Sequence, residues 1–282
     1  MGKHRLSVDN HDRDAQGLRY VYAVASRRAG GVSLGINLNP NRACNWRCIY
    51  CQVPDLTRGL GPIIDLERLE RELAGLLDDV REGRFQAANA PESRELKDVA
   101  FSGDGEPTSS PSFGEAVQLV GRVLEARQLL GELPITLITN GSMMSKAPVL
   151  EALAELAAMG GRVWFKLDAG TSAGAERING QPLDLDAHVR RAIKASAICP
   201  TFIQTCMVGL DGEPPPEDEI DAYLQRLREL AAAPTPPRGV LLYTLARPSH
   251  QPEAPRLSAL PRDWLEGLGR RIDATGLPAT LA

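Results

Sequence analysis

From residue 32 onward, short runs of apolar and β-branched residues alternate with longer polar segments that carry apolar residues at helical spacing. Six of the short runs are expected to form strands: Val32–Leu38, Val99–Ser102, Ile135–Thr139, Val163–Leu167, Phe202–Val208 and Val240–Leu245. Strands that alternate with helices are typical of βα units, in which the helices lie outside a parallel sheet. The pattern by itself allows either an open, doubly wound sheet or a partial barrel.

Amphipathic helices are expected in the segments between and after these strands. In the first segment, six apolar residues share one helical face: Leu66, Leu69, Leu73, Leu76, Leu77 and Val80. Ser112 and Glu115 have the spacing of a capping box, which predicts the start of the second helix. Further helices are predicted over residues 145–160, from about Asp184 to Ala197, after the Pro214–Pro216 run, and from Trp264 to about Gly276.

The composition is that of an ordinary globular protein of 282 residues with a formal net charge of −4, which argues against a strongly basic nucleic-acid-binding protein. No apolar run reaches the roughly 18 residues that a membrane span requires, and no secretory leader is recognised. The chain has five cysteines, which favours a reducing, cytoplasmic location over a disulfide-stabilised one. Two of them, Cys199 and Cys206, lie among apolar residues and are expected to be buried.

The other three cysteines, Cys44, Cys48 and Cys51, are separated by three and then two residues. A closed zinc site would require a fourth cysteine or a histidine nearby, but the nearest histidines are His11 and His188. Three thiolates can hold three irons of a four-iron cluster, which leaves the fourth iron open to a small molecule. The spacing therefore favours an open iron–sulfur cluster.

Polar residues follow the predicted strands at their carboxyl ends, where reactive groups gather in parallel α/β folds. The second strand ends in Ser102-Gly103-Asp104-Gly105-Glu106-Pro107-Thr108, and the third is followed by Asn140. The fourth ends in Lys166-Leu167-Asp168, the fifth carries Gln204, and the sixth precedes Arg247 and His250. By themselves, the Asp-Gly and Asn-Gly pairs indicate only turns. Lys166 and Asp168 face the same side of a strand and therefore require partners, either each other or a ligand.

The cysteine spacing is the signature of radical S-adenosylmethionine (SAM) enzymes, and the chain resembles that superfamily from about Val32 to Leu245. The resemblance implies an α/β fold with a partial (β/α)6 barrel of parallel strands and outer helices. It divides the chain into an N-terminal extension (residues 1–31), the core barrel (32–245) and a C-terminal loop with a closing helix (246–282). The ordered strand-end motifs are most similar to single-domain iron–sulfur oxidoreductases, which are grouped with the radical SAM core of tRNA wyosine synthases.

The resemblance also implies which residues bind the cofactors. Cys44, Cys48 and Cys51 would hold a [4Fe-4S] cluster, and the SAM-binding candidates are Tyr50, Ser102, Gly103, Gly105, Glu106, Pro107, Asn140, Lys166, Asp168 and Gln204. Tyr50 would lie beside the adenine, and Glu106 would accept hydrogen bonds from the methionine ammonium group. Asp104 replaces the first glycine of the family's Gly-Gly-Glu-Pro element. Arg247 and His250 are candidates for substrate binding, with an ion pair as the alternative role of Arg247.

The activity that the resemblance implies begins with one-electron reduction of the cluster by an external donor of flavodoxin or ferredoxin type. SAM would then be cleaved to methionine and a 5′-deoxyadenosyl radical, which abstracts a substrate hydrogen. The substrate is left open between a tRNA or nucleoside and a glycyl-radical enzyme that binds as a protein partner. The third alternative is a non-catalytic iron–sulfur or zinc protein, which would not need Glu106, Lys166 and Asp168 around an open iron.

Overall fold

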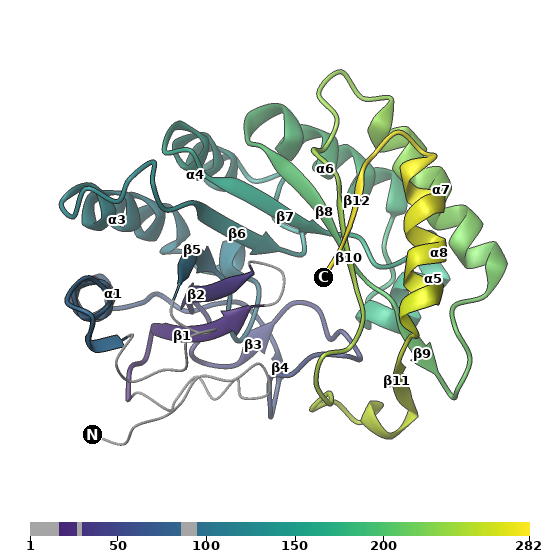
Figure 1. Ribbon diagram of the computed structural model, residues 1–282, viewed down its shortest axis with the longest axis horizontal. Helices are drawn as coiled ribbons and strands as arrows, with labels where there is room; N and C mark the ends of the chain where they lie inside the picture. The colour runs from purple at the N-terminus through teal and green to yellow at the C-terminus, as the bar shows by residue number, and fades with distance from the viewer. Residues whose placement is uncertain (1–16, 27–29, 86–94) are drawn as a thin grey trace.

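The computed structural model describes residues 17–26, 30–85 and 95–282, and its centre is a curved sheet of eight strands (Figure 1). In spatial order these are β1 (Val21–Ser26), β2 (Gly31–Ile36), β5 (Leu96–Phe101), β6 (Ile135–Thr139), β7 (Arg162–Lys166), β8 (Thr201–Cys206), β10 (Val240–Tyr243) and β12 (Ala279–Leu281). All neighbours pair in parallel except β1, which is antiparallel to β2. The two edge strands do not meet, so the barrel is partial.

The helices form an arc along the convex side of this sheet (Figure 1). They are α1 (Leu66–Arg81), α3 (Phe113–Glu125), α4 (Ala147–Ala158), α5 (Ser172–Asn179), α6 (Leu185–Ile198), α7 (Glu217–Ala231) and α8 (Arg262–Asp273). Short pairs of strands lie near the open side: β3 (Ala43–Cys44) with β4 (Thr57–Arg58), and β9 (Val208–Leu210) with β11 (Leu257–Ala259). Asp65 caps α1 by accepting a hydrogen bond from the Arg68 amide at 2.9 Å, which satisfies one of the free N–H groups of the first turn.

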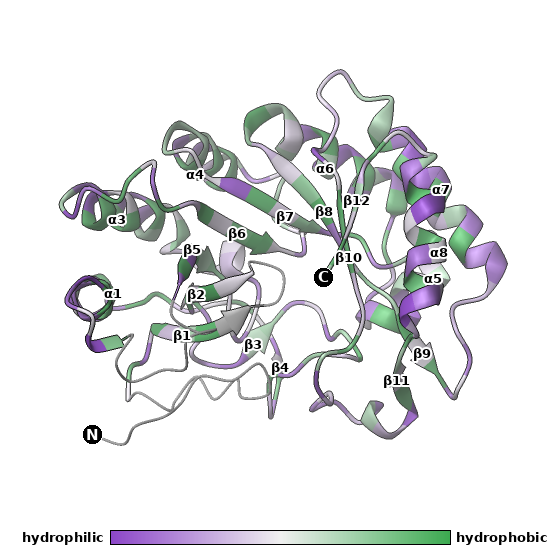
Figure 2. Cartoon of the chain, in the orientation of Figure 1, coloured by the Kyte–Doolittle hydropathy of each residue, from purple (hydrophilic) through white to green (hydrophobic). Residues whose placement is uncertain are grey.

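The strands separate apolar from polar side chains because successive residues of a strand face opposite sides. On the convex side, fully buried residues such as Leu34, Phe101 and Leu137 pack against the helices, and the strands are correspondingly hydrophobic in Figure 2. The alternate positions line the concave side and include polar residues such as Ser33 and Gln204. The fold therefore builds its core between sheet and helices and leaves the inner face of the sheet for a polar cavity.

The structure confirms the six predicted strands and the partial barrel, and it adds the edge strands β1 and β12. β1 lies in the predicted N-terminal extension, yet it pairs with β2 over six residues, and Tyr20 and Val21 belong to the main core. The rest of that extension, residues 1–16 and 27–29, lies outside the described residues. The helix α5 is also new, because its sequence Ser-Ala-Gly-Ala-Glu-Arg-Ile-Asn is short and carries almost no apolar stripe.

The capping box predicted at Ser112 is wrong. Ser112 stands at the N-cap of α3, but its side chain makes no cap hydrogen bond. Its hydroxyl instead accepts a hydrogen bond from the Ile64 amide at 3.2 Å, in the segment that leads into α1. The Ser112 side chain therefore forms a long-range hydrogen bond in place of the local cap that the motif predicts.

Among the helices that the structure describes, none has both the length and the apolar character needed to cross a membrane.

Candidate active site

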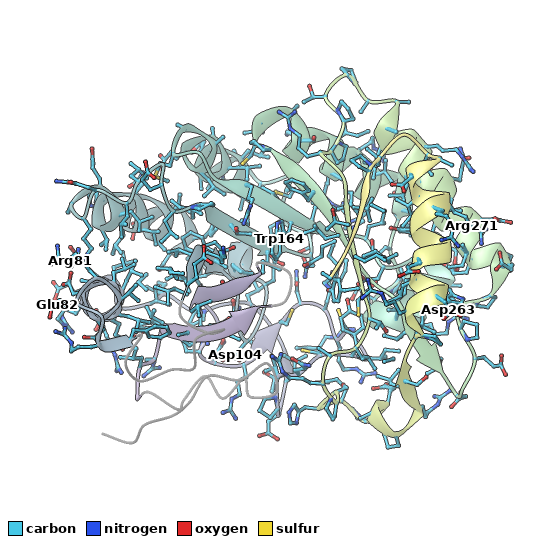
Figure 3. All side chains as sticks on the ribbon, in the orientation of Figure 1. Arg81, Glu82, Asp104, Trp164, Asp263 and Arg271 are labelled. Carbon is cyan, nitrogen blue, oxygen red and sulfur yellow. The ribbon has the colours of Figure 1, made fainter. Side chains whose placement is uncertain are left out.

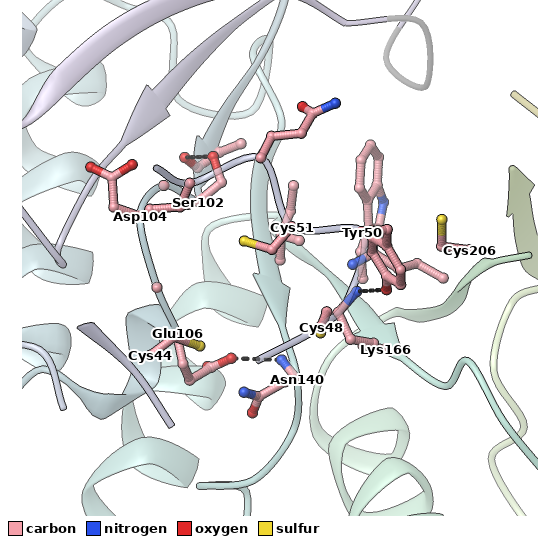
Figure 4. A pocket seen from close by; sticks show the side chains of 18 of the residues that line it. Cys44, Cys48, Tyr50, Cys51, Ser102, Asp104, Glu106, Asn140, Lys166 and Cys206 are labelled. Carbon is pink, nitrogen blue, oxygen red and sulfur yellow. Dashed lines mark hydrogen bonds between the residues drawn. The ribbon is translucent and has the colours of Figure 1, made fainter. Parts of the chain in front are cut away.

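The predicted site residues meet in a cavity of about 310 Å³ on the concave side of the sheet (Figure 4). Those that line it are Cys44, Cys48, Tyr50, Cys51, Ser102, Gly103, Gly105, Glu106, Asn140, Lys166, Gln204 and Arg247. Pro107 and Asp168 are buried behind the cavity wall, and His250 is exposed on the loop beyond Arg247. The topology thus brings together residues from six separate segments of the chain.

The same cavity contains residues that the motifs do not reveal: Tyr22, Ser33, Asp98, Trp164 and Tyr243. Trp164 lies near the middle of the molecule, whereas Arg81, Asp263 and Arg271 lie on outer helices (Figure 3). A signal for some of them was present in the sequence. A parallel strand that helices cover on both faces is a continuous apolar run. Polar residues at alternate positions of such a strand therefore indicate that one face of the sheet lines a polar cavity.

The three cysteines of the motif are free thiols, are partly exposed and lie along one cavity. Cys44 is the second residue of β3, and the amide of Cys51 donates to the carbonyl of Cys48 at 3.0 Å. Within the described residues, no three cysteine, histidine or acidic side chains are gathered closely enough to hold a single metal ion. A four-iron cluster does not require that convergence, since each thiolate binds a different iron. The donor set therefore fits the cluster that the sequence implies.

Burial affects the chemistry of these thiols. It raises the pKa of Cys44 to about 12 and that of Cys48 to about 11, because the thiolate form is disfavoured away from water. Iron binds the thiolate, so assembly of a cluster on this loop must release protons.

Glu106 connects the ends of two strands. It is 2% exposed, and its Oε1 accepts hydrogen bonds from the Thr108 amide, the Thr108 hydroxyl and, at 2.6 Å, the Thr139 hydroxyl. Its Oε2 accepts from the Asn140 amide at 2.6 Å (Figure 4). Burial raises the pKa of Glu106, and these hydrogen bonds oppose that rise. All four donors are uncharged, so none of them neutralises a negative charge on this carboxyl group.

Asn140 is also held in place by the cysteine loop. Its amide group donates to Asn45 Oδ1 at 2.8 Å, and its own Oδ1 accepts from the Ser142 amide at 3.0 Å. Asn45 in turn donates to the Ser142 hydroxyl at 2.7 Å. The end of β6 and the loop that carries Cys44 and Cys48 are therefore joined by a continuous set of side-chain hydrogen bonds.

Gly105 permits the closest approach in the site. A Cβ atom added at this residue would lie 2.1 Å from the carbonyl oxygen of Ala43, the residue before Cys44. The family resemblance implies a glycine here that lets the backbone approach the methionine amino group, and the structure shows a close approach to the strand before Cys44. Gly103 has a φ of 146° and would bring a Cβ within 2.4 Å of Asn37 Oδ1.

We expect Gly105→Ala to displace β3 and to lower the iron content after reconstitution severalfold, with an unfolding free energy reduced by about 3 kcal/mol through overpacking. Gly114→Ala is the matched control. Gly114 lies in α3, and the only atom near its added Cβ would be Ala152 Cβ of α4, at 3.9 Å. Iron content and urea unfolding of the two variants measure the difference. Equal behaviour of the two variants would contradict the proposed role of the close approach.

Tyr50, Lys166 and Asp168 form a hydrogen-bonded group at one side of the cavity, in which Asp168 is buried and the other two are partly buried. Lys166 Nζ donates to the Tyr50 hydroxyl at 2.6 Å (Figure 4). The Tyr50 hydroxyl donates to Asp168 Oδ2 at 2.5 Å, and Lys166 Nζ lies 3.5 Å from the same oxygen. Burial is the largest single effect and opposes the charge of Lys166, but Asp168 together with neighbouring acidic groups outweighs burial and raises the pKa of the ammonium group. Of the two kinds of partner expected for Lys166 and Asp168, each other or a ligand, the structure shows the first, with Tyr50 between them.

His188 supports the cysteine loop from behind. Its ring lies 5.7 Å from that of Trp46 and 4.8 Å from that of Phe165, and its Nε2 is 2.8 Å from the Lys166 carbonyl oxygen. Burial lowers the pKa of His188 from 6.5 to about 4. The folded protein therefore binds fewer protons here than the unfolded chain between pH 4 and 6.5, so stability contributed by His188 rises with pH through that window.

From this shift, the cluster-free protein is expected to lose about 2 kcal/mol of unfolding free energy between pH 7 and pH 5 through His188. Urea unfolding at the two pH values, compared with His188→Gln, measures this part of the loss. His250→Gln is the control, because His250 is exposed. The assignment fails if the pH dependence of His188→Gln equals that of the unchanged protein.

The segment after β10 fastens the cysteine loop, a role that the sequence does not reveal. The Ser249 hydroxyl lies 2.7 Å from the Ile49 carbonyl oxygen and 3.0 Å from that of Cys51, and its single O–H can donate to either. The amide of His250 also donates to the Cys51 carbonyl, at 2.9 Å. Arg47 and Glu253 form two hydrogen bonds of 2.9 and 2.7 Å. The structure thus gives the backbone of His250 a contact with the loop, and it places Arg247 on the cavity wall.

A parallel partial barrel that gathers three thiols and a buried carboxylate in one cavity has the construction of a cofactor-dependent barrel enzyme. Residues 38–227, more than half of the chain, match the Radical SAM superfamily, and the chain belongs to that family of enzymes, which use a [4Fe-4S] cluster and SAM.

A UPF0026 protein of Helicobacter pylori is 27% identical over 166 residues, which are 58% of this chain and 47% of that protein. The chain thus spans about half the length of the curated relatives it matches. The fold is similar to a radical SAM methyltransferase from Sphaerobacter thermophilus, with a TM-score of 0.60 and 16% identity over 96% of this chain and 71% of the other. SuiB of Streptococcus suis bound to S-adenosylmethionine gives a TM-score of 0.53 and 12% identity over 88% and 45%. At these identities the two structures support the fold alone.

Proposed function

We propose that this protein uses a reduced [4Fe-4S] cluster at Cys44, Cys48 and Cys51 to cleave SAM and to start radical chemistry on a substrate. The observation that carries the proposal is the meeting of these three thiols with Glu106 in one cavity. Three thiolates would leave one iron open, and a buried carboxylate in the same cavity suits the ammonium group of SAM. When bound, the reduced cluster supplies the electron that converts SAM to methionine and a 5′-deoxyadenosyl radical, which takes a hydrogen from the substrate.

The chain's own residues bind and orient the cofactor in this proposal. Glu106 accepts hydrogen bonds from the ammonium group of SAM. The hydrogen bonds that it also accepts from neutral protein donors keep the carboxylate in a fixed position. Lys166 brings a positive charge to the cavity wall and is held there by Tyr50. Residues 244–247, after β10, form part of the cavity wall and help to exclude water from the reacting groups. Gln204 and Asn140 complete the polar lining.

Anaerobic reconstitution with iron and sulfide tests the proposal, followed by dithionite reduction in the presence of SAM. We expect about four irons per chain, an absorbance typical of a [4Fe-4S] cluster, and 5′-deoxyadenosine that forms only with both reductant and SAM. A cluster that binds no SAM and yields no 5′-deoxyadenosine would favour an electron-transfer role. Binding of zinc in place of a cluster would overturn the proposal.

For the substrate, two classes are proposed. The site is compatible with a tRNA or nucleoside and with a glycyl-radical enzyme that binds as a protein partner. For the location of the protein we propose the cytoplasm. The family requires an external electron donor, and we propose a flavodoxin or ferredoxin for this chain. The resemblance to the radical SAM core of tRNA wyosine synthases is likewise part of the proposal.

A further inference from the structure

The end of α5 lies against the cysteine loop, and its role rests on the cluster proposed above. The Arg47 amide donates to the Asn179 carbonyl at 3.1 Å, and the Ile49 amide donates to the Ile178 carbonyl at 2.9 Å. Gly180 has a φ of 62°, and a Cβ added there would lie 2.6 Å from the Arg47 carbonyl oxygen. The turn therefore contacts the loop backbone on both sides of Cys48, closely enough that only glycine fits after Asn179.

The side chain of Asn179 is directed at the sulfur of Cys48. Asn179 is 1% exposed, and its Nδ2 donates to Cys48 Sγ at 3.4 Å and to Asp168 Oδ2 at 2.7 Å. An ionised carboxylate accepts but cannot donate, so Asp168 requires the NH₂ end of the amide to face this way. Asp168 is itself fixed by the Cys206 amide at 2.9 Å and the Tyr50 hydroxyl. One N–H of Asn179 thus meets the carboxylate while the other meets the sulfur.

Hydrogen bonds to the sulfurs are among the factors that set the reduction potential of an iron–sulfur cluster. Reduction adds one electron, and the added negative charge spreads onto the sulfurs, where an N–H donor stabilises it. We propose that Asn179 is a positioning residue that orients the Cys48 thiolate and raises the reduction potential of the cluster through its N–H···S hydrogen bond. It thereby makes the cluster easier for a one-electron donor to reduce.

Two substitutions of Asn179 test this role in the reconstituted, full-length protein. Asn179→Leu keeps the branched shape but has no N–H donor, and Asn179→Ala removes the group entirely. Asn41→Ala is the matched control, because the Asn41 amide donates to the Leu60 carbonyl in the same region and contacts no sulfur. The readouts are iron content and an anaerobic potentiometric titration followed by the EPR signal of the reduced cluster.

We expect both Asn179 variants to assemble a cluster whose reduction is disfavoured by up to about tenfold, a shift of 59 mV toward lower potential for one electron. The potential of Asn41→Ala should equal that of the unchanged protein. Equal potentials in all four proteins, or the same shift in Asn41→Ala, would overturn the role of Asn179 and leave the proposed function intact. If the unchanged protein assembled no cluster, the proposed function and this inference would both fail.

Discussion

Cys48→Ala is expected to abolish the production of 5′-deoxyadenosine, with a rate more than about a hundredfold below that of the unchanged protein. Loss of an outer partner of a metal site already costs up to about a hundredfold, and loss of a direct ligand should cost more. Cys48 is the middle one of the three motif cysteines in the sequence, and all three line the cavity. The measurement is iron content together with 5′-deoxyadenosine after anaerobic reduction with dithionite.

Cys199→Ala is the matched control for this substitution. Cys199 is a free cysteine in the main core at 1% exposure, with its thiol 3.4 Å from the Gly161 carbonyl oxygen. It should retain the cluster and the activity, and its cost is confined to the small cavity left in the core. A full cluster and full activity in Cys48→Ala would refute the assignment of Cys48 as an iron ligand.

Glu106→Gln is expected to weaken SAM binding by about 10- to 100-fold while the protein stays folded, because a hydrogen bond to a charged group contributes about 1.5–3 kcal/mol. Glutamine keeps the shape and one carbonyl acceptor for Thr108 and Thr139, but it removes the charge that would pair with the ammonium group. Glu106→Ala should also lower the unfolding free energy by about 3 kcal/mol, because it leaves several buried donors without an acceptor. Isothermal titration with SAM and urea unfolding separate the two effects.

The control for the charge is Glu155→Gln. Glu155 accepts a hydrogen bond from Gln118 at 2.9 Å between α3 and α4, on the outside of the sheet. SAM affinity should be unchanged in this variant. If Glu106→Gln bound SAM as tightly as Glu155→Gln, Glu106 would be a structural tie between β5 and β6 and would make no contact with the cofactor.

Much of the fold could be predicted because its determinants are local. Each of the six predicted strands is a short run rich in apolar residues, and each of the larger helices has an apolar stripe that the sheet buries. The strand β1 and the helix α5 were missed because contacts with other segments of the chain hold them. β1 (Val21–Ser26) is held by pairing with β2 and by contacts of the main core, whereas α5 (Ser172–Asn179) is held at its start by the Thr171 cap and at its end by the cysteine loop. Neither the pairing of β1 with β2 nor the contact of α5 with the cysteine loop can be read from a short stretch of sequence.

The candidate site divides in the same way. The cysteine triplet and the Gly105-Glu106-Pro107 element are recognisable because their residues are adjacent in the chain. The partners of Glu106 are less visible, since Thr139 lies 33 residues away. The contacts of Ser249 with the cysteine loop span about 200 residues, and no local pattern marks them.

By itself, the sequence determined the chemistry: three thiols at fixed spacing, polar residues at the ends of apolar strands, and enough alternation of strands and helices to require a parallel sheet. Only the tertiary structure decided how those groups meet. It joined Asn179 to Cys48, Tyr50 to Asp168 and Ser249 to the carbonyls beside the cysteines. The physical reason is that residue type determines which hydrogen bonds a side chain is able to form. Which of these hydrogen bonds it does form depends on the distant segment beside which it is buried.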